Sequence, residues 1–261
     1  MEWRPTTKLI RGTTRMKRTF LILAAVTFFG ITVSLAGAQT APAPTAAAGS
    51  SGSTGEQTIE ELYLKNVAMR VVREQATDLS RDSKLLALAS IREMINSGGV
   101  TKDSAVALDV LGYLANEGTA REVMENNQQI NNFPEVRRQA CNLLGQIGGQ
   151  QADEILMQVM MQDSEPMVLS EAAYALGQIG LNKDGLVSKR IADVVIRQTV
   201  VKPDNNFAFA SLLAFEKLAK KNNGLQDPTS FQAIVAISQG SYITAVKEKA
   251  LQVLDELKKY G

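Results

Sequence analysis

The chain has 261 residues, with 28 Lys plus Arg against 27 Asp plus Glu, no His, one Cys, 45% hydrophobic residues and 5% aromatic residues. The absence of His removes the commonest general base and metal ligand, and a single Cys can form neither an internal disulfide nor a thiolate cage for a metal. Zinc sites and Ser-His-Asp or Cys-His chemistry are therefore excluded. Nucleic-acid-binding proteins usually carry clustered positive charge and aromatic rings that stack on bases. This chain has a near-neutral charge and few aromatic rings, so no nucleic-acid partner is expected.

The N-terminal part has the layout of an export signal. Residues 20–38 read FLILAAVTFFGITVSLAGA, directly downstream of two basic residues at 17–18 and ending in the small residues at 36–38. This order is typical of a secretory signal peptide. We predict that residues 1–38 are a signal peptide with Met16 as the true initiator, and that the rest of the chain is exported to the periplasm. In the alternative, residues 20–38 stay uncleaved and anchor the protein to the inner membrane, because an apolar stretch of this length nearly spans a bilayer.

The next segment predicts a linker. Residues 39–55 read QTAPAPTAAAGSSGSTG, without a charged or large apolar residue, and such a segment cannot offset its ordering entropy by burial. We expect a flexible Ala/Pro/Gly/Ser linker over residues 39–57, or alternatively a ragged terminus, and a folded part over residues 58–261. Loss of residues 1–38 removes six basic residues and one acidic residue, so the mature chain, residues 39–261, keeps 22 basic and 26 acidic residues and a net charge of −4.

The folded part contains an internal repeat. Residues 134–148 read PEVRRQACNLLGQIG and residues 166–180 read PMVLSEAAYALGQIG, so eight of fifteen positions are identical at an offset of 32. Similarity at a fixed period in this range indicates stacked structural repeats.

Each repeat is predicted to be a pair of helices. From Val136 to Ile147 the apolar residues recur at the spacing of one helix face. Pro134 is suited to the first turn of this helix, and Gly148 is suited to the position directly after its last turn. Residues 151–162, QADEILMQVMMQ, predict a second, shorter helix. The same spacing recurs in SAVALDVLGYL upstream and over residues 207–218 and 246–257 downstream. We expect about ten or eleven helices between Thr58 and Tyr260 and no strand.

The pattern P-x-V-R-x-x-A-x-x-x-L-G-x-I-G over residues 134–148 resembles the HEAT-repeat family in its short bacterial form. The resemblance implies an all-α fold, a right-handed α-solenoid of stacked antiparallel helix pairs of the armadillo-like kind, with the second helices lining a concave surface. A ladder of Asp and Arg between repeats is usual in the family. Here Leu169 and Asn131 interrupt it, which leaves one expected contact, between Arg137 and Asp163.

The outward positions of the repeated helix are candidates for binding. Opposite the buried stripe lie Arg138 and Asn142, with Gln146 at the margin, and the equivalent positions in the next repeat are Ser170, Tyr174 and Gln178. Stacking aligns these positions into parallel rows, and Arg and Tyr are residue types that anchor protein interfaces. We predict these six residues as a protein-binding surface, with a merely solvated helix face as the alternative.

Other residues with reactive or metal-binding side chains are predicted to have structural roles. Cys141 is expected to be a small buried residue, with an exposed thiol available for an intermolecular disulfide as the alternative. Asp153 and Glu154 are expected near a helix end or on a solvated face, and not as a catalytic pair. The polar tract Glu125–Asn132 predicts a loop, alternatively a recognition loop. Four methionines are expected to fill the core and not to bind a soft metal: Met157, Met160, Met161 and Met167.

No motif for catalysis, a metal or a cofactor is found. We therefore expect a non-enzymatic periplasmic scaffold that binds another protein, of unknown identity, through its repeat surface. One alternative is a structural subunit of an envelope secretion or motility apparatus. Another is a ligand-handling factor, because short HEAT repeats resemble those of bilin lyases, although those enzymes work in the cytoplasm. Membrane contact is expected only through residues 20–38, if they remain uncleaved.

Overall fold

The computed structural model describes residues 58–260, so the predicted signal peptide and linker lie outside the described residues. Residues 58–260 contain ten α-helices, one small antiparallel hairpin and two short 3₁₀ turns. The elements are α1 (Ile59–Thr77), α2 (Arg81–Asn96), α3 (Ala105–Ala115), β1 (Met124–Glu125), β2 (Gln128–Gln129), α4 (Pro134–Ile147), α5 (Gln150–Gln162), α6 (Pro166–Ile179), η1 (Lys183–Gly185), α7 (Leu186–Val201), α8 (Asn205–Asn222), α9 (Pro228–Gln239), α10 (Thr244–Leu257) and η2 (Lys258–Tyr260). Within this range no helix has the length and apolar character needed to cross a membrane.

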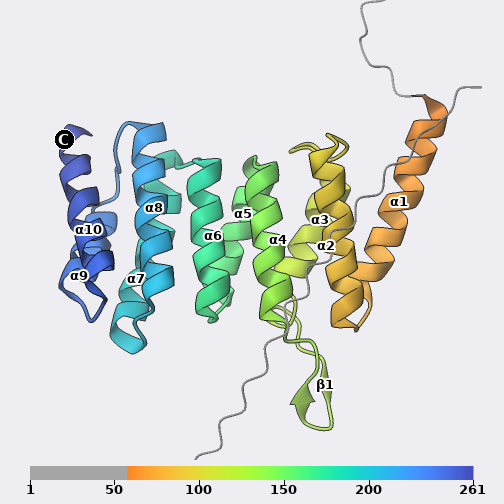
Figure 1. Ribbon diagram of the computed structural model, residues 1–261, viewed down its shortest axis with the longest axis horizontal. Coiled ribbons are helices and arrows are strands. Elements are labelled where there is room, and N and C mark those ends of the chain that lie inside the picture. Colours follow the sequence, from red (N-terminus) through yellow and green to blue (C-terminus); the bar gives the residue numbers. More distant parts are fainter. Residues whose placement is uncertain (1–57, 261) are drawn as a thin grey trace, which may run out of the picture. The chain divides into compact units, whose positions relative to one another are not determined.

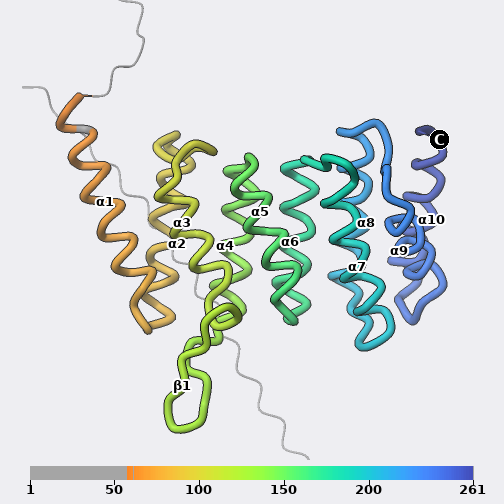
Figure 2. The backbone as a smooth tube through the Cα atoms, turned by 180° about the vertical axis from the view of Figure 1, so that it is seen from behind, coloured from red at the N-terminus to blue at the C-terminus, as the bar shows by residue number. Residues whose placement is uncertain are grey.

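The helices form consecutive pairs that stack side by side. Each odd-numbered helix pairs with the even-numbered helix that follows it, and even-numbered helices pack on one another along one layer while odd-numbered helices form the other. Figure 1 shows α4, α6 and α8 standing in a row, and Figure 2 shows the same stack from behind. The predicted all-α solenoid of stacked helix pairs is confirmed, as is the number of helices.

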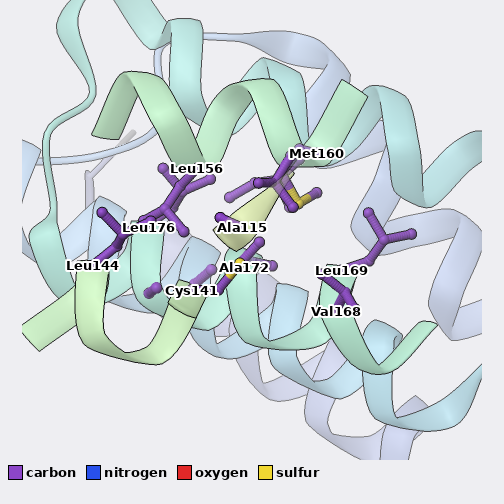
Figure 3. Close-up of a cluster of buried hydrophobic side chains, with 14 of the residues drawn as sticks. Ala115, Cys141, Leu144, Leu156, Met160, Val168, Leu169, Ala172 and Leu176 are labelled. Carbon is purple, nitrogen blue, oxygen red and sulfur yellow. The ribbon is translucent and has the colours of Figure 1, made fainter. Parts of the chain in front are cut away.

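The core is made by the apolar stripes that the repeat pattern predicts. Val136, Ala140 and Leu144 of α4 are fully buried. In Figure 3 the side chains of Leu144, Leu156 and Leu176 gather between α4, α5 and α6. Cys141 is buried in the same layer, and burial raises the pKa of its thiol. The prediction of a small buried cysteine is therefore confirmed, and the exposed thiol considered as its alternative is wrong.

Repeat-equivalent glycines set the spacing of the even-numbered helices. A Cβ atom at Gly145 would lie 2.7 Å from the Cβ of Ala175, and one at Gly177 would lie 2.7 Å from the Cα of Ala214. Both distances are too short for real contacts, so α4, α6 and α8 approach as closely as they do because these positions lack a side chain. Side chains on the outer face of adjacent helices are thereby brought within reach of one another.

One helix pair carries an insertion. Residues 116–133 join α3 to α4, whereas the other pairs are joined by the short turns 78–80, 163–165, 202–204 and 240–243. The insertion contains β1 and β2, which Figure 1 shows projecting beyond the helix ends. Asn126 and Asn127 form its tip with φ values of 48° and 62°, the left-handed region that asparagine tolerates in tight hairpins. The loop predicted over Glu125–Asn132 is confirmed only in part, because Glu125, Gln128 and Gln129 lie in the strands, and the expectation of no strand is wrong at this hairpin.

The predicted contact between repeats is present and buried. The Nε atom of Arg137 donates to Oδ2 of Asp163 over 2.6 Å, and both side chains are almost fully enclosed. The same guanidinium donates through Nη1 to the backbone oxygen of Glu117 over 3.1 Å and to Oδ1 of Asn132 over 2.8 Å. One cation thus joins α4, the turn before α6 and both ends of the insertion.

A second buried cation holds the insertion from the other side. Lys84 of α2 lies 3.2 Å from Oε2 of Glu117 and donates to the backbone oxygen of Ala76 over 2.8 Å. Asn131 donates to Oε1 of Glu117 over 3.0 Å and to the backbone oxygen of Arg121 over 2.7 Å. Because these groups are paired with one another, their burial is compatible with a stable fold.

The glycine spacing predicts an unusual sign for one substitution. In an ordinary helix Gly→Ala stabilises by up to about 1 kcal/mol, but Gly177→Ala should destabilise by about 2 kcal/mol because the added methyl meets the backbone of α8. Gly112 in α3, a helix of the other layer, is the control, since its Cβ would meet only the side chain of Ile155, at 3.2 Å. Urea unfolding of both variants measures the difference. Equal stabilisation of the two would show that α6 and α8 can move apart at little cost.

Candidate functional site

The first predicted row lies on the outer face of α4 and is internally hydrogen-bonded. Asn142 donates to Oε1 of Glu171 on α6 over 2.8 Å, and Gln146 donates to Oδ1 of Asn142 over 2.7 Å. A guanidinium nitrogen of Arg138 lies 3.8 Å from the other oxygen of Glu171. These three predicted residues therefore form a polar lattice between α4 and α6, and their side chains are largely engaged.

The second predicted row behaves differently. The Ser170 hydroxyl donates to the backbone oxygen of Pro166 within α6 over 2.6 Å, and Gln178 is exposed. Tyr174 is half-buried, and the ammonium of Lys217 on α8 lies 3.7 Å from the centroid of its ring. This distance is well inside the range of a cation–π contact. Tyr174 is thus held between α6 and α8 with its ring occupied by a cation.

An apolar cleft opens beside Tyr174. It has a volume of 330 Å³ and lies between α6, α8 and the start of α10. Phe209 is 39% exposed and Ile243 is 57% exposed, so large apolar side chains face solvent there. The lining residues are Ser170, Glu171, Tyr174, Asn205, Asn206, Phe209, Ala210, Leu213, Ile243, Ala245 and Val246. Of the six predicted residues, the structure brings Ser170 and Tyr174 into this cleft and leaves the other four outside its lining.

The α8 residues of the cleft were missed by the sequence analysis. Phe209, Leu213 and Lys217 occupy the outward positions of α8 and follow Ser170, Tyr174 and Gln178 at an offset of 39. The signal was present, because the buried stripe of residues 207–218 follows that of α6 at the same offset. Extending the two rows by one repeat would have identified the third.

Local interactions fix the walls of the cleft. Asp204 caps α8, since its side chain accepts from the backbone nitrogen of Phe207 over 2.8 Å. Asn205 in the first turn of α8 accepts from the backbone nitrogen of Ile243 over 3.0 Å, which places the start of α10 against α8. The hydroxyl of Tyr242 lies 2.7 Å from that of Thr199, which ties the same loop to α7. The cleft is therefore bounded by elements that are held in place.

Glu216 and Lys220 of α8 form ion pairs with Lys249 and Glu256 of α10. Glu216 lies 2.8 Å from Lys220 and 2.6 Å from Lys249, and Lys220 also lies 3.3 Å from Glu256. Hydrogen bonds from Lys220 and Lys249 lower the pKa of Glu216 to about 2, so this carboxylate is charged at every physiological pH. Lys221 donates to the backbone oxygens of Gln178 and Ile179 at the end of α6.

A second cavity lies at the base of the hairpin. It has a volume of 580 Å³, and Tyr113, Glu117, Arg121 and Asn131 are among its lining residues. Burial and the adjacent Glu117 raise the pKa of the Tyr113 hydroxyl. Glu117 and Asn131 are the groups that hold the insertion in place, so the polar side of this cavity is engaged in maintaining the fold.

Two predictions about buried and exposed residues need correction. Asp153 was expected near a helix end or on a solvated face but is 2% exposed, because α5 turns this position toward the interior while Glu154 faces outward. Met160 is buried and Met157 partly buried, as expected, whereas Met161 and Met167 are exposed. Met161 lies one residue beyond the inward stripe of α5, and Met167 stands in the first turn of α6. Across residues 58–260 no group of three or more His, Cys, Asp or Glu side chains could hold a metal ion.

Comparison with known proteins supports the repeat architecture. A family model described as HEAT repeats matches residues 128–194, which span the hairpin end, α4, α5, α6 and the first part of α7. No curated protein and no solved structure matches the chain. The matched region contains the two segments in which the repeat pattern is strongest, together with Arg137 and Asp163.

The buried Asp153 predicts a pH dependence of stability. Burial, reinforced by Glu154, raises the pKa of its carboxyl to about 7, whereas in the unfolded chain it would titrate near 3.8. The folded state therefore retains a proton that the unfolded state loses, and this contribution to stability is present below about pH 4 and is lost as the pH rises to 7.

Asp153→Asn should accordingly be more stable than the native chain at pH 8, by about 1–3 kcal/mol, and should gain far less at pH 5. Urea unfolding at the two pH values measures this difference. Asp103→Asn, at an exposed carboxylate, is the matched control and should leave the pH dependence as it is in the native chain. An equal effect of Asp153→Asn at both pH values would mean that the buried carboxyl is already charged at pH 5.

Proposed function

Because the chain belongs to the HEAT-repeat family, whose helix pairs serve as scaffolds for protein interactions, we propose that it is an exported, non-enzymatic scaffold of the periplasm. It binds another protein through the outer face of α4, α6 and α8. The observation that carries the proposal is the apolar cleft beside Tyr174, which adjoins the polar row of α4.

The chemistry of the cleft fits a protein interface. Tyr174 and Phe209 are aromatic, and aromatic side chains supply the anchoring contacts in most protein–protein interfaces. A volume of 330 Å³ stands at the small end of ligand sites, which suits the insertion of an apolar side chain from a partner. The polar lattice of α4 beside it would form the hydrated rim of such an interface.

Several side chains of types that serve in catalysis are engaged in other contacts, which favours a binding role. The Cys141 thiol is buried in the core. The Glu171 carboxylate at the cleft is engaged by Asn142 and Arg138, and Glu216 is engaged by two lysines. A binding surface requires none of these groups to react, so the proposal is consistent with the arrangement of the described residues.

Export is proposed from the sequence of the first 38 residues and has a direct test. Mass spectrometry of the protein purified from the cell envelope should find a mature N-terminus at Gln39, because residues 36–38 suit signal peptidase. An intact start at Met16 in the membrane fraction would favour the anchored form. A start at Met1 or Met16 in the cytoplasmic fraction would overturn export.

The binding face can be tested by site-specific photo-crosslinking in cells. A photoreactive residue at Gln178, exposed on α6, should capture one abundant partner, whereas one at Gln232, exposed on α9 in the opposite layer, should not. Phe209→Asp should abolish capture from Gln178 with little loss of stability, because this side chain already contacts solvent. Equal capture from both layers, or capture that survives Phe209→Asp, would contradict the proposed face.

A further inference from the structure

The cleft has a chemical asymmetry that points to the kind of segment it accepts. Along α8, the outward positions Phe209, Leu213 and Lys217 are one helical turn apart, so two apolar side chains are followed by a basic one. Phe209 and Leu213 line the cleft, and Lys217 lies at its rim over the ring of Tyr174. The cleft therefore changes from apolar to cationic along the direction of α8.

Lys217 is the lysine of α8 that has neither a carboxylate partner nor a hydrogen-bond acceptor within the described residues. Lys220 is paired with Glu216 and Glu256, and Lys221 donates to backbone oxygens at the end of α6. For Lys217, the described part of the chain supplies the Tyr174 ring and no carboxylate within ion-pair distance. Its charge is thus oriented by a contact that does not neutralise it.

The carboxylate on the opposite wall is already satisfied. Glu171 lines the cleft on the side of α6, but its two oxygens face Asn142 at 2.8 Å and Arg138 at 3.8 Å. A positively charged ligand would have to compete with these two groups. A negatively charged ligand meets a free ammonium whose side chain is already ordered, so little conformational entropy is lost on binding.

We propose that the cleft takes a partner segment in which a large apolar side chain is followed, one helical turn away, by a carboxylate that pairs with Lys217. This inference rests on the proposed function and specifies the chemistry of the partner. The apolar side chain enters between Tyr174, Phe209 and Leu213. The carboxylate lies at the Lys217 end, where the ring of Tyr174 limits the access of water to the pair.

Three short peptides of equal length and the full chain provide the test. One peptide carries Phe and Glu one turn apart, the second carries Phe and Lys, and the third carries Ala and Glu. In low salt the Phe–Glu peptide should bind about tenfold more tightly than either of the others by fluorescence anisotropy, and the preference should shrink as salt is added.

Substitutions assign the preference to one side chain. Lys217→Met keeps the apolar stem and should remove the preference for Glu over Lys, whereas Lys217→Arg should retain it. Lys220→Met is the matched control, because that lysine is already paired with two carboxylates and should not affect the preference. Circular dichroism and urea unfolding confirm that each variant is folded.

The outcomes separate this inference from the proposed function. Equal or tighter binding of the Phe–Lys peptide, no binding of any peptide, or a preference that survives Lys217→Met overturns the acidic segment. If a partner captured from Gln178 is then still lost in Phe209→Asp but not in Lys217→Met, the scaffold proposal stands alone. If no partner is captured from Gln178, the proposed function itself fails.

Discussion

The buried ion pair between Arg137 and Asp163 is the contact on which the alignment of the stack depends. It joins the second helix pair to the third. The Nη1 atom of Arg137 also donates to Glu117 and Asn132, at the start and end of the insertion. Two charges withdrawn from water are tolerated only when each is fully paired, and removal of one partner of such a pair typically costs about 3–5 kcal/mol. The orientation of α4 relative to α6 is therefore fixed by a contact that cannot be removed without a large loss of stability.

Lys84 and Glu117 extend the same principle toward the N-terminal end. The insertion between α3 and α4 would otherwise leave a long polar segment next to the core, with backbone groups in need of partners. Asn131 satisfies two of those groups, since its side chain donates to the backbone oxygen of Arg121 and accepts from the backbone nitrogen of Val123. Glu117 accepts from Asn131, and Lys84 of α2 neutralises the Glu117 carboxylate. The helix pair that carries the insertion thus stays in register with its neighbours, and the outer faces of α4, α6 and α8 form one continuous surface.

The sequence predicted what depends on local periodicity. The stripes of α4 and α6 and the glycines at 145 and 177 follow from the offset of 32, and the contact of Arg137 with Asp163 follows from the family resemblance. The burial of Lys84 and Asp153 could not be predicted, because it depends on neighbours contributed by distant elements. The outward row of α8 (Phe209, Leu213 and Lys217) was not predicted, because the interval lengthens to 39 residues and few identities with α6 remain, although the spacing of the buried residues persists.

The position of the cleft follows from the division of each helix into inward positions, which stabilise the stack, and outward positions, which form its surface. The inward positions of α4, α6 and α8 are apolar, apart from the buried Arg137 and Ser211, so the same helix packing recurs from one pair to the next. The outward positions are free to change, and they do: Arg138, Asn142 and Gln146 on α4 are replaced by Phe209, Leu213 and Lys217 two helices later in the layer. Because glycine brings α6 and α8 close together, the ring of Tyr174 can bridge to Lys217 across the gap. The proposed binding specificity can therefore reside in solvent-facing positions, whose side chains vary without disturbing the packing of the helices.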